Sequence, residues 1–203
     1  EFEGILEPLG RIAGRAYIIN SSLSTTAMAI GAGQKPSVIS AIMKYHTTEL
    51  ARAIGTDAMD IHGGKAVMLG PKNYLSTAHE ASPIGITVEG ANIMTRSLII
   101  FGQGAFRCHP YVLKEIAAVN LEDQTEAIEQ FDIHFFNHVG YTISNAARSL
   151  VRGITNRFTD SPVLDETAIY YKQINRFSAA FALLTDVSML VIGGSLKRKE
   201  TIS

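Results

Sequence analysis

Long stretches of this chain repeat apolar residues at spacings of three and four, and this periodicity restricts its fold more than any other feature. The first stretch places its apolar residues on one stripe of a helix: Ile5, Leu9, Ile12, Ala16, Ile19 and Leu23. It runs into Gly31-Ala32-Gly33, where glycine favours the end of a helix. We therefore predict one long amphipathic helix that ends near Gly31.

A second helix is expected between Pro36 and the pair Gly63-Gly64. Proline fits the first turn of a helix because its missing N–H would have no helical partner there. Apolar residues lie on one side of this helix and others on the opposite side: Val38, Ile42, Tyr45, Ala53 and Ile61 on the first, and Ile39, Leu50 and Ile54 on the second. Such a helix is usually interior to a bundle or at an oligomer contact.

Residues 63–83 are expected to be irregular, because Gly70-Pro71 and Ser82-Pro83 both break helices. A third helix is expected to begin near Glu89-Gly90 and to continue to Phe101. Gly102, Gly104, His109 and Pro110 then interrupt the pattern. We place a subdomain boundary near residues 105–122.

Two long helical segments follow, the first from Ile128 to Ile154 and the second from Leu164 to Val191. The short turn Thr159-Asp160-Ser161-Pro162 between them predicts an antiparallel hairpin. No alternating pattern is long enough to build a sheet. The predicted fold class is all-α, with an antiparallel helical bundle at residues 1–105 and an additional helical hairpin within residues 106–203.

Composition narrows the possible functions. Hydrophobic residues make up 46% of the 203 residues and charged residues 18%, which is typical of a folded chain and not of a disordered one. The net charge of −1 does not favour a nucleic-acid partner, since such modules normally carry a basic patch. The single cysteine, Cys108, cannot form an internal disulfide, which fits a reducing, cytoplasmic compartment.

One stretch of the sequence, Ser178 to Leu196, is long and apolar enough to span a membrane. Asp186 lies at its middle, where a carboxylate would be expensive in hydrocarbon. A helix inside a bundle is the preferred interpretation. Acidic residues occupy the place where a signal peptide would need basic ones, and the chain does not begin with Met, so we expect a piece of a longer protein or a trimmed chain.

Two local features suggest chemistry. Gly63-Gly64 permits positive φ or the close approach of a ligand, although on local sequence alone an ordinary helix end is the preferred explanation of the pair. Glu89 follows a run of apolar residues, so partial desolvation would raise the pKa of its carboxyl toward the range of a useful base. The alternative is an ordinary acidic residue in the first turn of a helix.

Other candidates are weaker. His134 and His138 are four residues apart, a spacing found in zinc sites, but no third ligand is evident and a structural pair is preferred. Adjacency in the sequence does not make Cys108 and His109 a nucleophile and its base. We predict no metal site.

The segment from Asp57 to Phe101 resembles the C-terminal domain of acyl-CoA dehydrogenases. It reads DAMDIHGGK, then LGP, then ITVEGANIMTRSLIIF, so a Gly-Gly turn and a Val-Glu-Gly motif occur in the family's order and spacing. Lys44 and Asp57-Ala58 extend the resemblance toward Arg11. This variant resembles the bacterial fatty-acid β-oxidation branch, whose members carry a helical region after the standard domain. The resemblance makes residues 1–105 the standard domain and 106–203 the appended region.

The resemblance implies site residues. Glu89 aligns with the carboxylate that removes the α-proton of an acyl-CoA thioester while the β-hydrogen leaves as hydride to the flavin of FAD. Gly90 aligns with the residue that keeps the backbone accessible to the thioester. The implied FAD contacts are Gly63, Gly64, Asp60, Ala91 and Ile93. At three of them this sequence departs from the family: Asp60 replaces a usual Gln, and Ala91 and Ile93 replace a usual Thr and Gln.

The resemblance also implies partners: an acyl-CoA substrate, electron-transferring flavoprotein and further copies of the chain in a homo-oligomer. Family members hold FAD between a β-barrel domain and this helical domain, and no barrel is encoded here, so we expect the piece alone to bind FAD weakly and to be inactive. Two alternatives stay open. Residues 106–203 could dock on a partner or peripherally on the inner membrane, or the whole chain could be a structural bundle.

Overall fold

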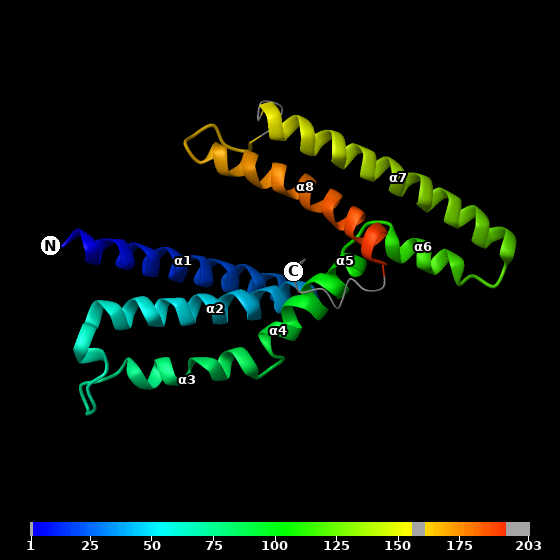
Figure 1. Ribbon diagram of the computed structural model, residues 1–203. Coiled ribbons are helices and arrows are strands. Elements are labelled where there is room, and N and C mark those ends of the chain that lie inside the picture. Colours follow the sequence, from blue (N-terminus) through cyan, green and yellow to red (C-terminus); the bar gives the residue numbers. More distant parts are fainter. Residues whose placement is uncertain (1, 156–160, 194–203) are drawn as a thin grey trace. The chain divides into compact units, whose positions relative to one another are not determined.

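The structure is a computed structural model that describes residues 2–155 and 161–193 (Figure 1). Within those ranges the chain forms helices joined by turns and has no strand, which confirms the predicted all-α class. The chain divides into two compact units, of which the first ends at Gln103 and the second begins at Gly104.

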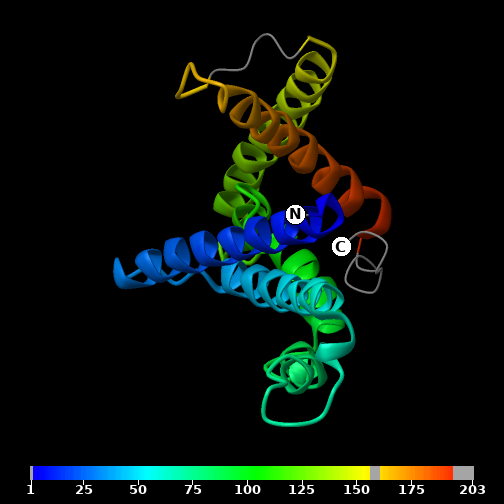
Figure 2. The same ribbon diagram turned by 90° about the vertical axis from the view of Figure 1, so that its left-hand side faces the viewer.

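The first unit is organised around one central helix. Its elements are α1 (Glu3–Gly31), α2 (Ser37–His62), the 3₁₀ helix η1 (Gly63–Ala66), α3 (Ser76–Thr87), α4 (Asn92–Met94) and the π-helix η2 (Thr95–Gln103). Helices α1 and α2 run antiparallel and side by side, and α3 lies along α2 (Figures 1 and 2). Because η2 also packs on α2, this helix contacts α1, α3 and η2 in the unit, which fits the first of its two predicted settings, the interior of a bundle. The second, an oligomer contact, stays a prediction.

The long first helix packs only lightly. None of the residues of α1 is buried. Ile12 and Ile19 of the predicted stripe are half-buried, whereas Ile5, Leu9 and Leu23 are exposed. The predicted buried face of this helix is therefore only partly correct, because the face that meets α2 also contains polar side chains. Among them, Arg15 makes an ion pair with Asp57 of α2.

The predicted irregular segment is only irregular in its first half. Helix α1 ends at Gly31 and α2 at His62, as predicted. Ser82-Pro83, however, does not break the chain, because Pro83 lies inside α3. Helix α3 packs along α2, and Gly85 of α3 lies next to Thr48 of α2. Helix α3 continues through Pro83 although the proline removes a backbone hydrogen bond.

The third predicted helix starts later and continues further than expected. It begins at Asn92 rather than near Glu89-Gly90. Helical turns continue through Gly102 and Gly104 to the end of α5 (Gly104–Arg107), so these two glycines do not end it. Both glycines are buried, which gives them a packing role. The turns from Thr95 to Gln103 have the wider π form, which is often found near functional sites.

The second unit contains a helical hairpin. After α5 come α6 (Val112–Val119), α7 (Gln124–Thr155) and α8 (Ala168–Ile192). Helices α7 and α8 pack as the antiparallel hairpin that the sequence predicts, and α6 packs on α7 (Figures 1 and 2). Of the predicted turn, residues 159 and 160 lie outside the described residues.

In the described chain, helices α7 and α8 have no large apolar side chain among their buried residues. The buried side chains of the pair are small or polar: Asn145, Ala179, Thr185, Asp186 and Ser188. Large apolar side chains of α8 point outward and are exposed, including Phe177 and Phe181. By length and composition α8 could cross a membrane. Only 22% of its most apolar window is buried, whereas the core helix of a bundle is mostly buried. The preferred sequence interpretation, a helix buried inside a bundle, is therefore wrong for most of its surface.

Candidate functional site

Glu89 lies in the bend between α3 and α4 and has an unusual backbone conformation. Its φ is +58°, and among the described residues it is the one non-glycine residue with positive φ. The next residue, Gly90, has a φ of +89°, so two successive residues are left-handed. This conformation costs a non-glycine residue on the order of 1–2 kcal/mol. The bend therefore keeps a glutamate where a glycine would fit more easily.

The surroundings of Glu89 differ from the sequence prediction in two ways. The side chain is exposed, as are the preceding apolar residues Ile84 and Val88, so the described residues do not supply the predicted desolvation. Glu89 also lies three residues before the first residue of α4, and so it is not a first-turn residue. Its carboxylate is thus presented outward from a sharply bent backbone.

The bend is held by a lysine of the central helix. The Nζ of Lys44 donates to the carbonyl oxygens of Ile86 (3.2 Å) and Gly90 (2.6 Å) and to Oδ1 of Asn92 (2.6 Å). Thr95 Oγ1 donates to the same Gly90 carbonyl at 3.2 Å. The backbone on both sides of Glu89 is therefore tied to α2 and to the start of η2.

Asn92 is the buried partner in this arrangement. Its side chain is only 3% exposed. Besides accepting from Lys44, it donates through Nδ2 to Thr48 Oγ1 and to Glu49 Oε1, both at 2.9 Å. Sequence reasoning did not single out Asn92, although a polar residue between apolar ones in EGANIM was a signal that could have found it.

The predicted cofactor residues fall into two separate groups. Asp60, Gly63 and Gly64 are exposed at the carboxyl end of α2. Ala91 is half-buried and Ile93 is 70% exposed, and both are next to Asn92. Lys44 and Asp60 are sixteen residues apart on one helix, which is roughly 24 Å at 1.5 Å per residue. Within one chain, the Gly-Gly turn and the Glu89 bend therefore do not form a single site.

The two glycines of the turn differ. Gly63 has a φ of +55°, so its conformation alone explains the glycine. Gly64 does not have positive φ, and a Cβ placed on it would meet nothing within 4 Å. The described chain therefore gives no reason for glycine at position 64.

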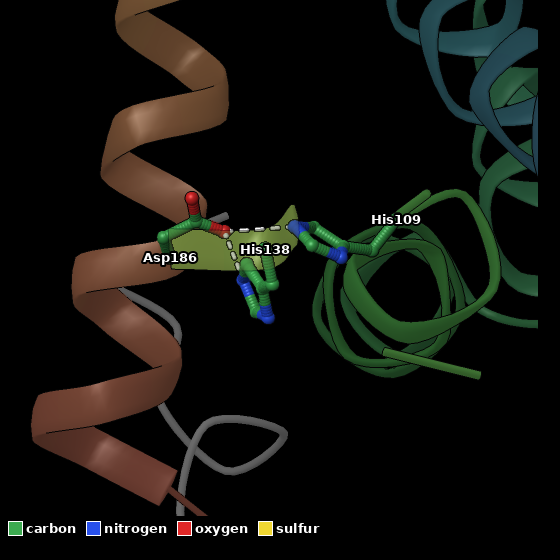
Figure 3. Close-up of side chains that lie close together, drawn as sticks. All are labelled: His109, His138 and Asp186. Carbon is green, nitrogen blue, oxygen red and sulfur yellow. Dashed lines mark hydrogen bonds and ion pairs between the residues drawn. The ribbon is translucent and has the colours of Figure 1, made fainter. Parts of the chain in front are cut away.

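A second cluster of ionisable groups occurs in the second unit (Figure 3). His109, His138 of α7 and Asp186 of α8 offer ligand atoms that all lie within 4.8 Å of one another, and both rings point toward the carboxylate. His109 Nε2 is 2.9 Å from Asp186 Oδ1, and His138 Nε2 is 3.5 Å from the same oxygen. Thr142 donates to the other carboxylate oxygen at 2.7 Å.

The hydrogen bonds of His109 do not suit a metal ligand. Its Nδ1 accepts from the backbone N–H groups of Tyr111 and Val112, both at 3.2 Å, at the start of α6. The ring proton must then be on Nε2, the atom that a metal would need. A metal-bound histidine normally donates its other N–H to an acceptor, and here that nitrogen faces two donors. The geometry instead supports a neutral His109 that joins α6 to α8.

Burial also favours the neutral ring. Burial lowers the pKa of His109 below its ordinary value of 6.5, and this effect exceeds the opposing attraction of the Asp186 carboxylate. His138 completes the cluster, because its Nδ1 lies 2.8 Å from Glu115 Oε1. Sequence reasoning paired His138 with His134, whereas the structure pairs it with groups 23, 29 and 48 residues away in the chain.

Two family comparisons match the two halves of the chain. The family model described as acyl-CoA dehydrogenase, C-terminal domain, matches residues 1–102. The chain belongs to the acyl-CoA dehydrogenase family. A second family model, described as acyl-CoA dehydrogenase, C-terminal, bacterial type, matches residues 106–203. No solved structure matches the chain.

The family assignment places the two clusters in different parts of the acyl-CoA dehydrogenase. Glu89, Lys44 and Asn92 lie in the segment matched by the general C-terminal domain. His109, His138 and Asp186 lie in the segment matched by the bacterial type. The resemblance inferred from the Gly-Gly and Val-Glu-Gly motifs is therefore confirmed as to family.

Proposed function

We propose that this chain is part of an FAD-dependent acyl-CoA dehydrogenase that converts acyl-CoA to trans-2-enoyl-CoA in fatty-acid β-oxidation. Glu89 is the base that removes the α-proton. The observation that carries the proposal is its backbone: Glu89 alone among the described non-glycine residues has positive φ, within a bend that hydrogen bonds hold in place. Strained residues held in this way concentrate at functional sites.

The exposed position of Glu89 is consistent with a base that acts against a partner surface. A carboxylate can accept the α-proton only where the thioester can reach it. Gly90 follows with a φ of +89°, and a Cβ there would lie 3.3 Å from Thr95 Oγ1, so position 90 needs glycine on two grounds. Without a side chain at position 90, the backbone next to Glu89 stays open to the thioester.

The proposed cofactor is FAD, which when bound supplies the acceptor for the hydride that leaves the β-carbon. Asp60, Gly63 and Gly64 would contact it at one end of α2, and Ala91 and Ile93 beside the bend. Gly64 supports this assignment, because neither its conformation nor its surroundings in the described chain require glycine. A closely approaching ligand would require it.

The separation of the two groups favours a homo-oligomer. One copy would contribute the Glu89 bend, and the Gly63-Gly64 turn of a neighbouring copy would contact the same cofactor. The distance of roughly 24 Å along α2 is the reason for assigning them to different copies. We further propose acyl-CoA as substrate, electron-transferring flavoprotein as electron acceptor and a cytoplasmic location.

Replacing Glu89 by Gln in the intact enzyme that contains this chain tests the base. Glutamine keeps the size of the side chain but cannot accept the proton, so turnover should fall by about 10²- to 10⁴-fold while FAD content is retained. Glu80→Gln, which changes an exposed carboxylate of α3, is the matched control. Unchanged turnover of Glu89→Gln would favour a structural role for the chain.

A second candidate function concerns the second unit. The outward apolar side chains of α8 and its exposed Arg176 suit a peripheral contact with an anionic membrane. Flotation of the intact enzyme with anionic vesicles tests this, with Phe181→Gln as the variant and the equally exposed Met28→Gln of α1 as control. Absence of binding by the intact enzyme removes this candidate.

A further inference from the structure

We infer that Lys44 is a positioning residue for the catalytic base. Its hydrogen bonds fix the backbone on both sides of Glu89 and go to other groups than the Glu89 carboxylate. The inference rests on the proposed function of Glu89. It assigns a specific task to a lysine on the central helix α2, 45 positions before the base in the sequence.

The first argument is the convergence of acceptors on Lys44. An ammonium group has three N–H donors, and Lys44 Nζ has three acceptors within 3.2 Å: the carbonyls of Ile86 and Gly90 and Oδ1 of Asn92. All three acceptors are uncharged, so the lysine is not part of an ordinary ion pair with them. Hydrogen bonds from a charged donor are about twice as strong as neutral ones.

The second argument is where those acceptors lie. Ile86 is in the last turn of α3, where carbonyl groups lack helical partners. Gly90 follows Glu89, and Asn92 is the first residue of α4. The lysine therefore holds one point before Glu89 and two points after it. These points bracket the residue whose conformation is costly, and they prevent the bend from relaxing.

The third argument is that further residues hold the same segment. The Gly90 carbonyl accepts a second hydrogen bond from Thr95, and Asn92 is bound to Thr48 and Glu49 of α2. Lys44 is thus one of two charged residues, with Glu49, in a network that converges on the segment 86–95. A residue that served only to attach α3 to α2 would not need to bind Gly90.

Loss of positioning has a recognisable kinetic effect. A small displacement of a base slows the proton transfer itself, by as much as about 10²-fold, while the substrate still binds. Removal of the α-proton then becomes more strongly rate-limiting. The isotope effect on kcat with α-deuterated acyl-CoA should increase, whereas a simple loss of folded protein would lower the amount of active enzyme without changing that isotope effect.

The experiment compares Lys44→Met, Lys35→Met and Glu89→Gln in the FAD-loaded enzyme that contains this chain. Lys35 is an exposed lysine of the turn between α1 and α2 and serves as the matched control. For Lys44→Met we expect kcat per bound FAD to fall at least tenfold, KM to stay within about twofold and the isotope effect to rise. For Lys35→Met we expect wild-type values.

Three results would overturn the inference, the third of them in a replacement variant. If Glu89→Gln is inactive but Lys44→Met keeps the wild-type kcat per FAD and isotope effect, Lys44 is only structural and the proposed function stands. If Glu89→Gln keeps its turnover, the proposed function fails and the inference fails with it. Should Lys44→Met not yield folded enzyme, Lys44→Arg replaces it, because arginine keeps the charge but cannot place three donors at one point. An unchanged isotope effect in Lys44→Arg would also refute the role.

Discussion

Glu89 shows how one residue can be unfavourable for folding and still be retained. Glycine adopts its φ of +58° without steric cost. We therefore predict that Glu89→Gly keeps or raises the free energy of unfolding of the 203-residue chain, by up to about 1 kcal/mol, while the intact enzyme loses activity. Denaturant unfolding measures the first effect.

A matched variant, Glu80→Gly, tests whether the expected gain in free energy of unfolding is specific to position 89. Glu80 is exposed in the interior of α3, where glycine is unfavourable. Glu80→Gly should lower the free energy of unfolding by roughly 0.5–1 kcal/mol. Equal losses in the two variants would show that the backbone of Glu89 is not strained.

His109 gives a pH dependence that can be predicted at the same scale. Its pKa is lower in the folded chain than the ordinary 6.5, so the unfolded chain binds the proton more readily. The free energy of unfolding should therefore decrease as the pH falls below about 6.5 and should be steady above it. Denaturant unfolding at a series of pH values from 7.5 to 5 measures this.

Two variants separate the contacts of the ring. In His109→Asn, the side-chain oxygen can replace Nδ1 as acceptor for the start of α6, but no group titrates at this position. His109→Gln can instead donate to Asp186 and loses the helix contact. We expect His109→Asn to be the more stable of the two and to have a smaller pH slope than the wild type. An identical slope in wild type and His109→Asn would exclude His109 as the source.

At the scale of elements, two ion pairs join α1 to α2. Arg11 and Arg15 both bind Asp57, which is buried in α2, while no residue of α1 is itself buried. The hydrogen bond from Arg11 is the largest of the effects that hold the pKa of Asp57 below its usual 3.8. This stabilisation is complete above pH 3.8 and is lost as the pH falls through the lower folded-state value.

Asp57→Asn should therefore loosen α1 more than it affects the rest of the unit. The two arginines would face a neutral amide, so we expect amide hydrogen exchange in α1 to accelerate by about tenfold or more while α3 changes little. Glu7→Gln is the control, because Glu7 contacts Arg11 at 2.7 Å on the exposed side of α1. Equal acceleration in α1 and α3 would contradict a local role for Asp57.

At the scale of the whole molecule, many large apolar side chains of the described residues are exposed and the buried ones are mostly small or polar. Such a surface is expected to be covered in an assembly. Lys44, which holds the Glu89 bend, and Asp60 of the other group of proposed FAD contacts are also roughly 24 Å apart along α2. We therefore predict that the isolated 203-residue chain binds FAD weakly and is inactive. Titration followed by flavin fluorescence measures this, and tight stoichiometric binding would refute it.

Local patterns determined much of the fold. The periodicity of apolar residues predicted α1, α2 and the α7–α8 hairpin, and glycine correctly marked Gly31 and Gly63 as ends. It did not predict α3, because Pro83 lies inside that helix and a proline normally marks a break. The Gly-Gly and Val-Glu-Gly motifs drew attention to Glu89 because each is a local pattern of the sequence, but its positive φ and its exposure were not visible there.

The sequence by itself determined the all-α class and the family of this chain, because helical periodicity and motif spacing are local along the chain. Only the tertiary structure decided which side chains meet. Lys44 reaches Gly90 and Asn92, and His109 reaches Asp186, across 46, 48 and 77 positions. Hydrogen bonds act over about 3 Å in space, and no local pattern records which distant residues will come that close.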